Sequence, residues 1–206
     1  MRILFLLTFT FIFLFSCLKD NEEEHKNDTT QSTLKPIEIP AQKIEKSKLT
    51  YNNHGATWTL NGILYSGCVE EFYANGTLKE KFYLAKGKKQ NESLHWYEDG
   101  HLKFLKNYHQ GKWHGEIKEW TADSAHKLLS HLNYFEGKIH GIQKIWYPTG
   151  EIHKVLQLDM GQEKGLQKAY RKNGVLYANY EARNGRIFGL KKAELCYGLK
   201  NEDIEF

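Results

Sequence analysis

The feature that most constrains the fold is a repeat of about 24 residues that occurs five times in succession. The first copy reads GCVEEFYANGTLKEKFYLAKGKKQ. The copies begin at Gly67, Asn91, Gly115, Gly141 and Gly165, and a partial sixth begins at Gly189, so the starts lie 24, 24, 26, 24 and 24 residues apart. Such a period indicates that each copy is one supersecondary unit, which buries its apolar residues only by stacking on its neighbours.

Glycines recur at three places in the copies. One set ends Asn-Gly, Asp-Gly or Thr-Gly pairs, a second closes each copy, and a third opens the next copy. Glycine accepts positive φ without steric cost, as tight hairpin turns require, so we interpret all three sets as turn glycines. They are Gly76, Gly100, Gly150 and Gly174; Gly111, Gly137, Gly161 and Gly185; and Gly115, Gly141, Gly165 and Gly189. Each copy is then a β-hairpin, and the whole is an antiparallel meander.

Apolar residues form columns between these turns. An aromatic residue holds one position of every first strand, and we interpret this set as a structural column: Phe72, Trp96, Trp120, Trp146 and Tyr170. Every second strand opens with an aliphatic residue, from Leu78 to Leu176, and further apolar residues follow at the same parity. Alternation with a period of two predicts a half-buried sheet with one apolar face. We therefore predict an all-β, elongated, single-layer meander of five to six hairpins, whose apolar face is wrapped by its own curvature or completed by a partner.

The copies resemble the bacterial variant of the MORN repeat over about residues 55 to 190. That repeat has the form Gly-x-x-x-x-aromatic-Tyr-x-x-Gly, then Leu, then a closing Gly-Lys-x-x-Gly. Matching stretches here are EFYANGTLKEKFYLAKGK, HWYEDGHLKFLKNYHQGKWHG and KIWYPTGEIHKVLQLDMGQEKG. Proteins of this kind are often labelled YwqK-type antitoxins. The resemblance implies a sheet used for docking or scaffolding, with no catalytic residues and no cofactor.

The N-terminus predicts export and lipidation. Residues 3–15 are almost wholly apolar but fall short of the roughly 20 residues that span a bilayer, which is typical of a secretory signal. Leu14-Phe15-Ser16-Cys17 resembles the lipobox of bacterial lipoproteins, which is cleaved before a lipidated cysteine. We expect a signal peptide at 1–16 and a lipid anchor on Cys17, in the cell envelope and most simply at the outer membrane.

A polar stretch follows, and we interpret residues 17–50 as the lipidated cysteine and a disordered tether because they have no apolar period. Its acidic cluster, Asp20 and Glu22 to Glu24, resembles a surface-export signal of some lipoproteins or is simply a solvated linker. Residues 51–206 then form the repeat domain. The whole chain carries 29 basic and 25 acidic side chains, and this small excess argues against nucleic acid as a partner.

No constellation of residues in the sequence predicts a reaction. The array holds eight histidines, but none of them forms a helical metal motif. The one cross-strand convergence that the pattern offers is His131 with His153, and we expect no metal site. There is no Gly-x-Ser-x-Gly elbow and no phosphate loop, so we expect no enzyme. His114 lies in GKWHG, where other copies have Gln90, His140, Lys164 and Phe188, so it is interpreted as part of a turn.

Tyrosines next to the aromatic column suggest a candidate binding face, which would comprise Tyr73, Tyr97, Tyr147, Lys79 and Lys103. A mixture of tyrosine and lysine suits protein or glycan recognition. The alternative is that a repeated sequence produces a repeated surface whether or not that surface binds anything. The leading hypothesis is a membrane-anchored module that binds a protein partner in the envelope. The alternatives are an antitoxin or immunity protein and a small-ligand or glycan-binding lipoprotein.

Overall fold

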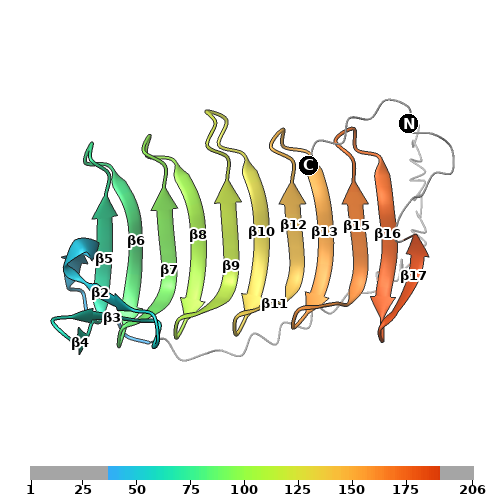
Figure 1. Cartoon of the computed structure of the whole chain (residues 1–206). Coiled ribbons are helices and arrows are strands. Elements are labelled where there is room, and N and C mark those ends of the chain that lie inside the picture. The colour runs from blue at the N-terminus through green and yellow to red at the C-terminus, as the bar shows by residue number, and fades with distance from the viewer. Residues whose placement is uncertain (1–36, 191–206) are drawn as a thin grey trace, which may run out of the picture. The chain divides into compact units, whose positions relative to one another are not determined.

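The computed structural model of the chain describes residues 37–190 (Figure 1). The predicted signal peptide, Cys17 and the first part of the tether lie outside these residues, as does the segment 191–206. Among the described residues, one long sheet of 14 strands forms an open antiparallel meander. The predicted all-β fold of stacked hairpins is therefore confirmed.

Each copy of the repeat contributes two neighbouring strands to this sheet. The first strands are β5 (Gly67–Phe72), β7 (Lys88–Trp96), β9 (Lys112–Trp120), β12 (Gly141–Trp146) and β15 (Gly165–Tyr170). The second strands are β6 (Leu78–Ala85), β8 (Leu102–His109), β10 (Leu128–Phe135), β13 (Ile152–Asp159) and β16 (Leu176–Arg183). Short segments β11 (Lys138–Ile139) and β14 (Gln162–Glu163) extend β12 and β15, and β17 (Arg186–Leu190) ends the described part.

Residues 37–66, which precede the repeats, are ordered and cover one end of the sheet (Figure 1). Residues 37–50 were expected to belong to a disordered tether, but they contain β1 (Lys43–Glu45) and the 3-10 turn η1 (Lys46–Lys48). β1 pairs with β5 in parallel, which is an exception to the antiparallel order. β2 (Thr50–Asn52), β3 (Thr57–Leu60) and β4 (Ile63–Leu64) form a separate small sheet. The domain boundary predicted at residue 51 is therefore too late.

This N-terminal part builds the best-buried core of the described residues. Phe82 and Leu84 on β6 are fully buried, together with Val69 on β5. Trp58 on β3 lies over the ring of Phe82, with the ring centroids 5.5 Å apart. The small sheet thus gives the first hairpin a second layer that the later hairpins do not receive from any described element.

A β-bulge in every hairpin reverses the expected facing of the leucine column. Glu71 pairs with Glu80, but the next pair is Phe72 with Leu78, so one extra residue lies in β6. Phe72 and Leu78 therefore face one side of the sheet, while Phe82 faces the other. The same shift occurs where Trp96, Trp120, Trp146 and Tyr170 pair with Leu102, Leu128, Ile152 and Leu176. We call the two sides the Trp96 face and the Phe82 face, and the expectation of a single apolar face is wrong.

The glycines serve two different purposes. Gly111, Gly137, Gly161 and Gly185 follow another residue of positive φ in two-residue turns, and Gly76, Gly100, Gly150 and Gly174 close the turns at the opposite ends of the strands. Gly115, Gly141, Gly165 and Gly189, which were also interpreted as turn residues, instead lie within β9, β12, β15 and β17. All four have positive φ, and register shifts near Gly115, Gly141 and Gly165 show that β9, β12 and β15 bulge there, whereas β17 pairs with β16 in continuous register through Gly189. His114 therefore lies in a bulged strand, not in a turn.

Buried glutamines fill two of these bulges. Gln143 is fully buried, and its side-chain amide both accepts from the backbone N–H of Asn133 at 2.7 Å and donates to the Asn133 carbonyl at 3.2 Å. Gln167 makes the same two contacts with the backbone of Gln157. These amides satisfy backbone groups that the bulge removes from the ladder, which explains why a polar side chain is buried there.

Candidate functional site

The tyrosines of the candidate binding face connect consecutive repeats. The Tyr73 hydroxyl donates to the carbonyl oxygen of Trp96 at 2.8 Å, and Tyr97 donates to that of Trp120 at 2.9 Å. Tyr147 repeats the contact with the Tyr170 carbonyl at 2.9 Å. Each tyrosine thus bridges two consecutive hairpins, with donor and acceptor residues 23 positions apart, so its polar end is already used inside the sheet.

The two lysines of the candidate binding face lie against these tyrosine rings. The Lys79 ammonium is 5.7 Å from the Tyr73 ring centroid, and Lys103 is 5.1 Å from that of Tyr97. In the fourth copy His153 holds the lysine position, and its ring stacks on Tyr147 with centroids 4.4 Å apart. The structure therefore gives these residues a role in joining repeats, which sequence parity alone did not indicate.

The tyrosine bridge predicts a modest and specific loss of stability. We expect Tyr97→Phe to lower the free energy of unfolding by about 1 kcal/mol, because it removes one hydrogen bond and little apolar area. The measurement is urea unfolding followed by tryptophan fluorescence. Tyr51→Phe is the control, since Tyr51 is 46% exposed and its hydroxyl makes no hydrogen bond within residues 37–190. Equal effects of the two substitutions would contradict a bridging role for Tyr97.

The third copy replaces this bridge with a different one. Thr121 stands at the tyrosine position, and its hydroxyl donates to Asp123 at 2.7 Å and accepts from the Lys127 backbone at 2.9 Å. The Lys127 ammonium then donates to the carbonyl oxygen of Thr149 in the next turn. The longer turn is thus closed internally, and a lysine makes the link to the following repeat.

A buried charge cluster lies on the Phe82 face beneath η1. Glu80 is only 4% exposed, and its carboxylate lies 2.6 Å from the Lys46 ammonium and 2.9 Å from that of Lys89. Burial alone would raise the pKa of Glu80, but these two cations outweigh it and hold the pKa below its usual range. Lys46 also pairs with Glu71 at 2.8 Å, so η1 is held on the sheet by ionic contacts as well as by the apolar core.

His95 lies in the same cluster as an uncharged side chain at neutral pH. Burial is the main reason why the pKa of His95 is lowered to about 4. The negative charge of Glu80 raises this pKa, whereas the positive charges of Lys89 and Lys106 lower it further. Burial and the Lys89 charge also lower the pKa of Lys106. These are perturbed groups of the kind that occur at functional sites, although structural ion-pair networks produce them as well.

The geometry of the cluster does not support nucleophilic catalysis. Ser93 Oγ and Glu80 Oε1 both lie 3.4 Å from the same atom, Nε2 of His95. A catalytic triad needs the serine on one ring nitrogen and the carboxylate on the other, so that the histidine can relay a proton. Ser93 is also fully buried, which leaves a substrate no path to its hydroxyl. The cluster therefore stabilises the covered end of the sheet.

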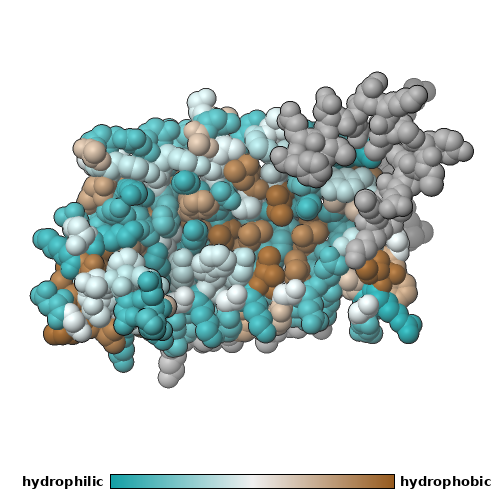
Figure 2. Space-filling model, viewed as in Figure 1, coloured by the Kyte–Doolittle hydropathy of each residue, from teal (hydrophilic) through white to brown (hydrophobic). Residues whose placement is uncertain are grey.

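The rest of the Phe82 face carries an apolar surface that no described element covers. From β8 to β13 this face presents apolar side chains that are mostly half-buried, and these are Phe104, Tyr108, Ile117, Leu132, Tyr134, Ile145, Leu156 and Leu158. Figure 2 shows hydrophobic side chains gathered over the middle of the sheet. Every described element from β7 onward belongs to the one sheet, so the layer over Phe82 does not continue here.

The opposite face has a pocket at the N-terminal end. It measures about 680 Å³ and is lined by residues 39–41 together with side chains of β1, β5, β6, β7 and β8, among them Lys43, Lys81 and Glu92. Lys43 is also paired with Glu70 at 2.9 Å. The lining offers charges of both signs, and the hypothesis of a small ligand would place the ligand here.

The structure does not bring His131 and His153 to one point. His131 Nε2 lies 3.1 Å from Glu116 Oε1, whereas His153 stacks on Tyr147. His114 is 22% exposed and lies 3.4 Å from Glu136 Oε1, with its ring beside that of Phe135. None of these three histidines shares a cluster of metal-ligand type with two others in the described part of the chain.

The fold and these surfaces define a class of protein, namely a hairpin-repeat protein whose Phe82 face carries an apolar surface that no described element covers. No protein-family model matches the sequence, and no curated protein matches it significantly. The resemblance to MORN-type repeats and to YwqK-type antitoxins therefore stays a prediction.

Proposed function

We propose that this chain is a lipid-anchored interaction module of the bacterial envelope, which docks a protein partner on the Phe82 face of its sheet. The observation that carries the proposal is the apolar surface from β8 to β13, which no described element covers. Contiguous apolar patches of this kind on a soluble domain are typical of interaction sites.

The composition of this face fits a protein partner. Aliphatic and aromatic side chains occupy the middle, while Lys106, Glu119 and Lys154 place charges of both signs among them. An apolar centre with nearby charges is the usual anatomy of a protein interface, and the charges would set the orientation of the partner. The proposal assigns no catalytic step to the chain.

The anchor in the proposal rests on the sequence. Cys17 and the lipobox-like residues before it lie outside the described part of the chain. Within the described part, no helix has the length and apolar character to cross a bilayer. A lipidated Cys17 would hold the sheet at the membrane surface, and the polar stretch after it would set its distance from the bilayer.

Site-specific photocrosslinking in envelopes tests the proposal. A photoreactive residue at Leu132 on the Phe82 face is expected to capture one protein, whereas the same residue at Ile142 on the Trp96 face is expected to capture none. Ile142 is a matched control because it is an apolar residue on the neighbouring strand and is 52% exposed. Leu132→Lys should abolish capture from Leu156, and Ile142→Lys should not.

The outcome also separates the alternatives. Capture of a protein that is toxic in the absence of this chain would identify the partner as an effector, as the resemblance to antitoxins implies. Equal capture from both faces, or none from either, would refute docking on the Phe82 face.

A further inference from the structure

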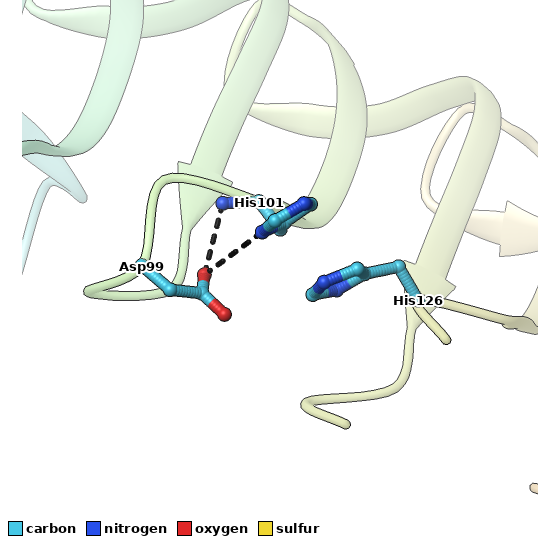
Figure 3. Close-up of side chains that lie close together, drawn as sticks. All are labelled: Asp99, His101 and His126. Atoms are coloured by element: carbon cyan, nitrogen blue, oxygen red, sulfur yellow. Dashed lines mark hydrogen bonds and ion pairs between the residues drawn. The ribbon is translucent and has the colours of Figure 1, made fainter. Parts of the chain in front are cut away.

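Two turns of neighbouring repeats bring together Asp99, His101 and His126 (Figure 3). One oxygen or nitrogen atom from each residue lies within 4.8 Å of those of the other two. The two imidazole rings are stacked face to face, with centroids 3.4 Å apart and planes inclined by 9°. The carboxylate of Asp99 accepts from the His101 backbone N–H at 3.0 Å and lies 3.4 Å from His101 Nδ1.

The local structure of each turn explains these positions. In the turn between β7 and β8, the Gly100 N–H donates to the Tyr97 carbonyl, and Asp99 fixes the backbone of His101. The turn between β9 and β10 is two residues longer, and His126 has a positive φ of 43° there. The neighbouring copies have Gly100 and Gly150 with positive φ in the corresponding turns. A histidine in this backbone conformation is less stable than glycine by roughly 1 kcal/mol, so the imidazole of His126 is present at the expense of some stability of the turn.

The donor types of the three groups suit a cation. Asp99 supplies a carboxylate, whose oxygen accepts from the His101 backbone N–H and lies close to a ring nitrogen of each histidine. Nδ1 of His126 is shielded from water and has no hydrogen-bond partner within residues 37–190. Imidazole nitrogens with a carboxylate oxygen form a donor set that zinc and similar transition metals prefer.

We propose that Asp99, His101 and His126 bind a divalent transition-metal ion of the zinc type, with water at the remaining position. Ligands 2.0–2.2 Å from tetrahedral zinc are about 3.4 Å from one another, so the three donors, which lie within 4.8 Å of one another, must approach by up to about 1.4 Å. The side chains of Asp99 and His101 are 50% and 55% exposed and are therefore free to rotate by that amount. The ion would unstack the rings and link the second hairpin to the third.

Metal titration of the full chain in mild detergent tests the site. After chelator treatment, zinc chloride is added and binding is measured by calorimetry, while histidine side-chain NMR signals identify the ligands. We expect one zinc ion per chain with a Kd below about 100 μM, and shifts of the His101 and His126 signals. Failure to bind at millimolar zinc would overturn the proposal.

Three variants separate the ligands from the fold. His126→Gly removes the imidazole but supplies the residue that favours positive φ, and Asp99→Asn keeps an oxygen that accepts from the His101 backbone. Each should weaken zinc binding at least tenfold while the urea midpoint is unchanged or rises. His131→Ala is the matched control, because His131 faces Glu116 on the sheet, and it should leave zinc binding unchanged. Unchanged binding by His126→Gly would refute the site.

Discussion

Phe82→Ala is expected to lower the free energy of unfolding of the covered end of the sheet by about 3–5 kcal/mol. The Phe82 ring is fully buried between Trp58 and the Lys89 ammonium, which lies 4.3 Å from the ring centroid. Truncation would leave a cavity beneath the small N-terminal sheet and would also remove the contact that fixes Trp58. No later repeat in the described residues has an equivalent layer, so the loss should be local.

Hydrogen exchange measures this effect strand by strand. In a repeat array each unit is stabilised mainly by its neighbours, so protection should fall first in β5 to β7 and much less in β13 to β16. Phe72→Ala is the matched control on the same hairpin, because Phe72 faces the opposite side and is 49% exposed. It should change stability by less than about 1 kcal/mol. Similar losses from both substitutions would show that the two faces are equally buried.

Glu80→Gln should destabilise the same end by roughly 3 kcal/mol at pH 7. Removing one partner of a buried ion pair leaves uncompensated charge, which typically costs about 3–5 kcal/mol. The lower end applies here because Lys46 and Lys89 keep 30% and 20% of their side chains in contact with water. Urea unfolding at pH 7 gives the magnitude, and Glu116→Gln is the control. Glu116 also pairs with a lysine and a histidine but is 48% exposed, so its substitution should cost less than about 1 kcal/mol.

The effect of Glu80→Gln should also depend on pH. The pKa of Glu80 is lowered in the folded chain, so its contribution is complete above the unfolded value of 4.5 and is lost as pH falls through the folded value. The difference between the wild type and Glu80→Gln should therefore narrow below pH 4.5. A difference that is constant from pH 7 to pH 3 would mean that the carboxylate charge contributes nothing.

The repeat made the sheet predictable from local chemistry. Glycines at fixed intervals, with apolar and polar residues alternating between them, specify the hairpins. No knowledge of distant contacts is needed, because turn geometry and the pairing of consecutive strands are local. The facing of Leu78 was predicted wrongly for a physical reason. One extra residue near the start of β6 turns Leu78 to the face of the sheet opposite to the one that alternation predicts. No residue type marks this β-bulge in the sequence.

The candidate sites depended more on tertiary structure. The tyrosines were found by their column, but the carbonyl that each hydroxyl reaches lies in the next repeat. Glu80 and Lys46 are 34 positions apart, and only the fold of the N-terminal segment onto β6 brings them together. That segment has no apolar period, and its order comes from pairing with β5 and from these ionic contacts.

The sequence by itself determined the repeat unit, the hairpins and the order of strands, because each follows from contacts within about 24 residues. The tertiary structure decided which face each column occupies, how far the N-terminal layer extends, and where His126 lies. The turn between β9 and β10 is two residues longer than the others, and its amino-acid composition does not specify its backbone conformation. Only the position of this turn beside the preceding hairpin stacks the His126 ring on that of His101.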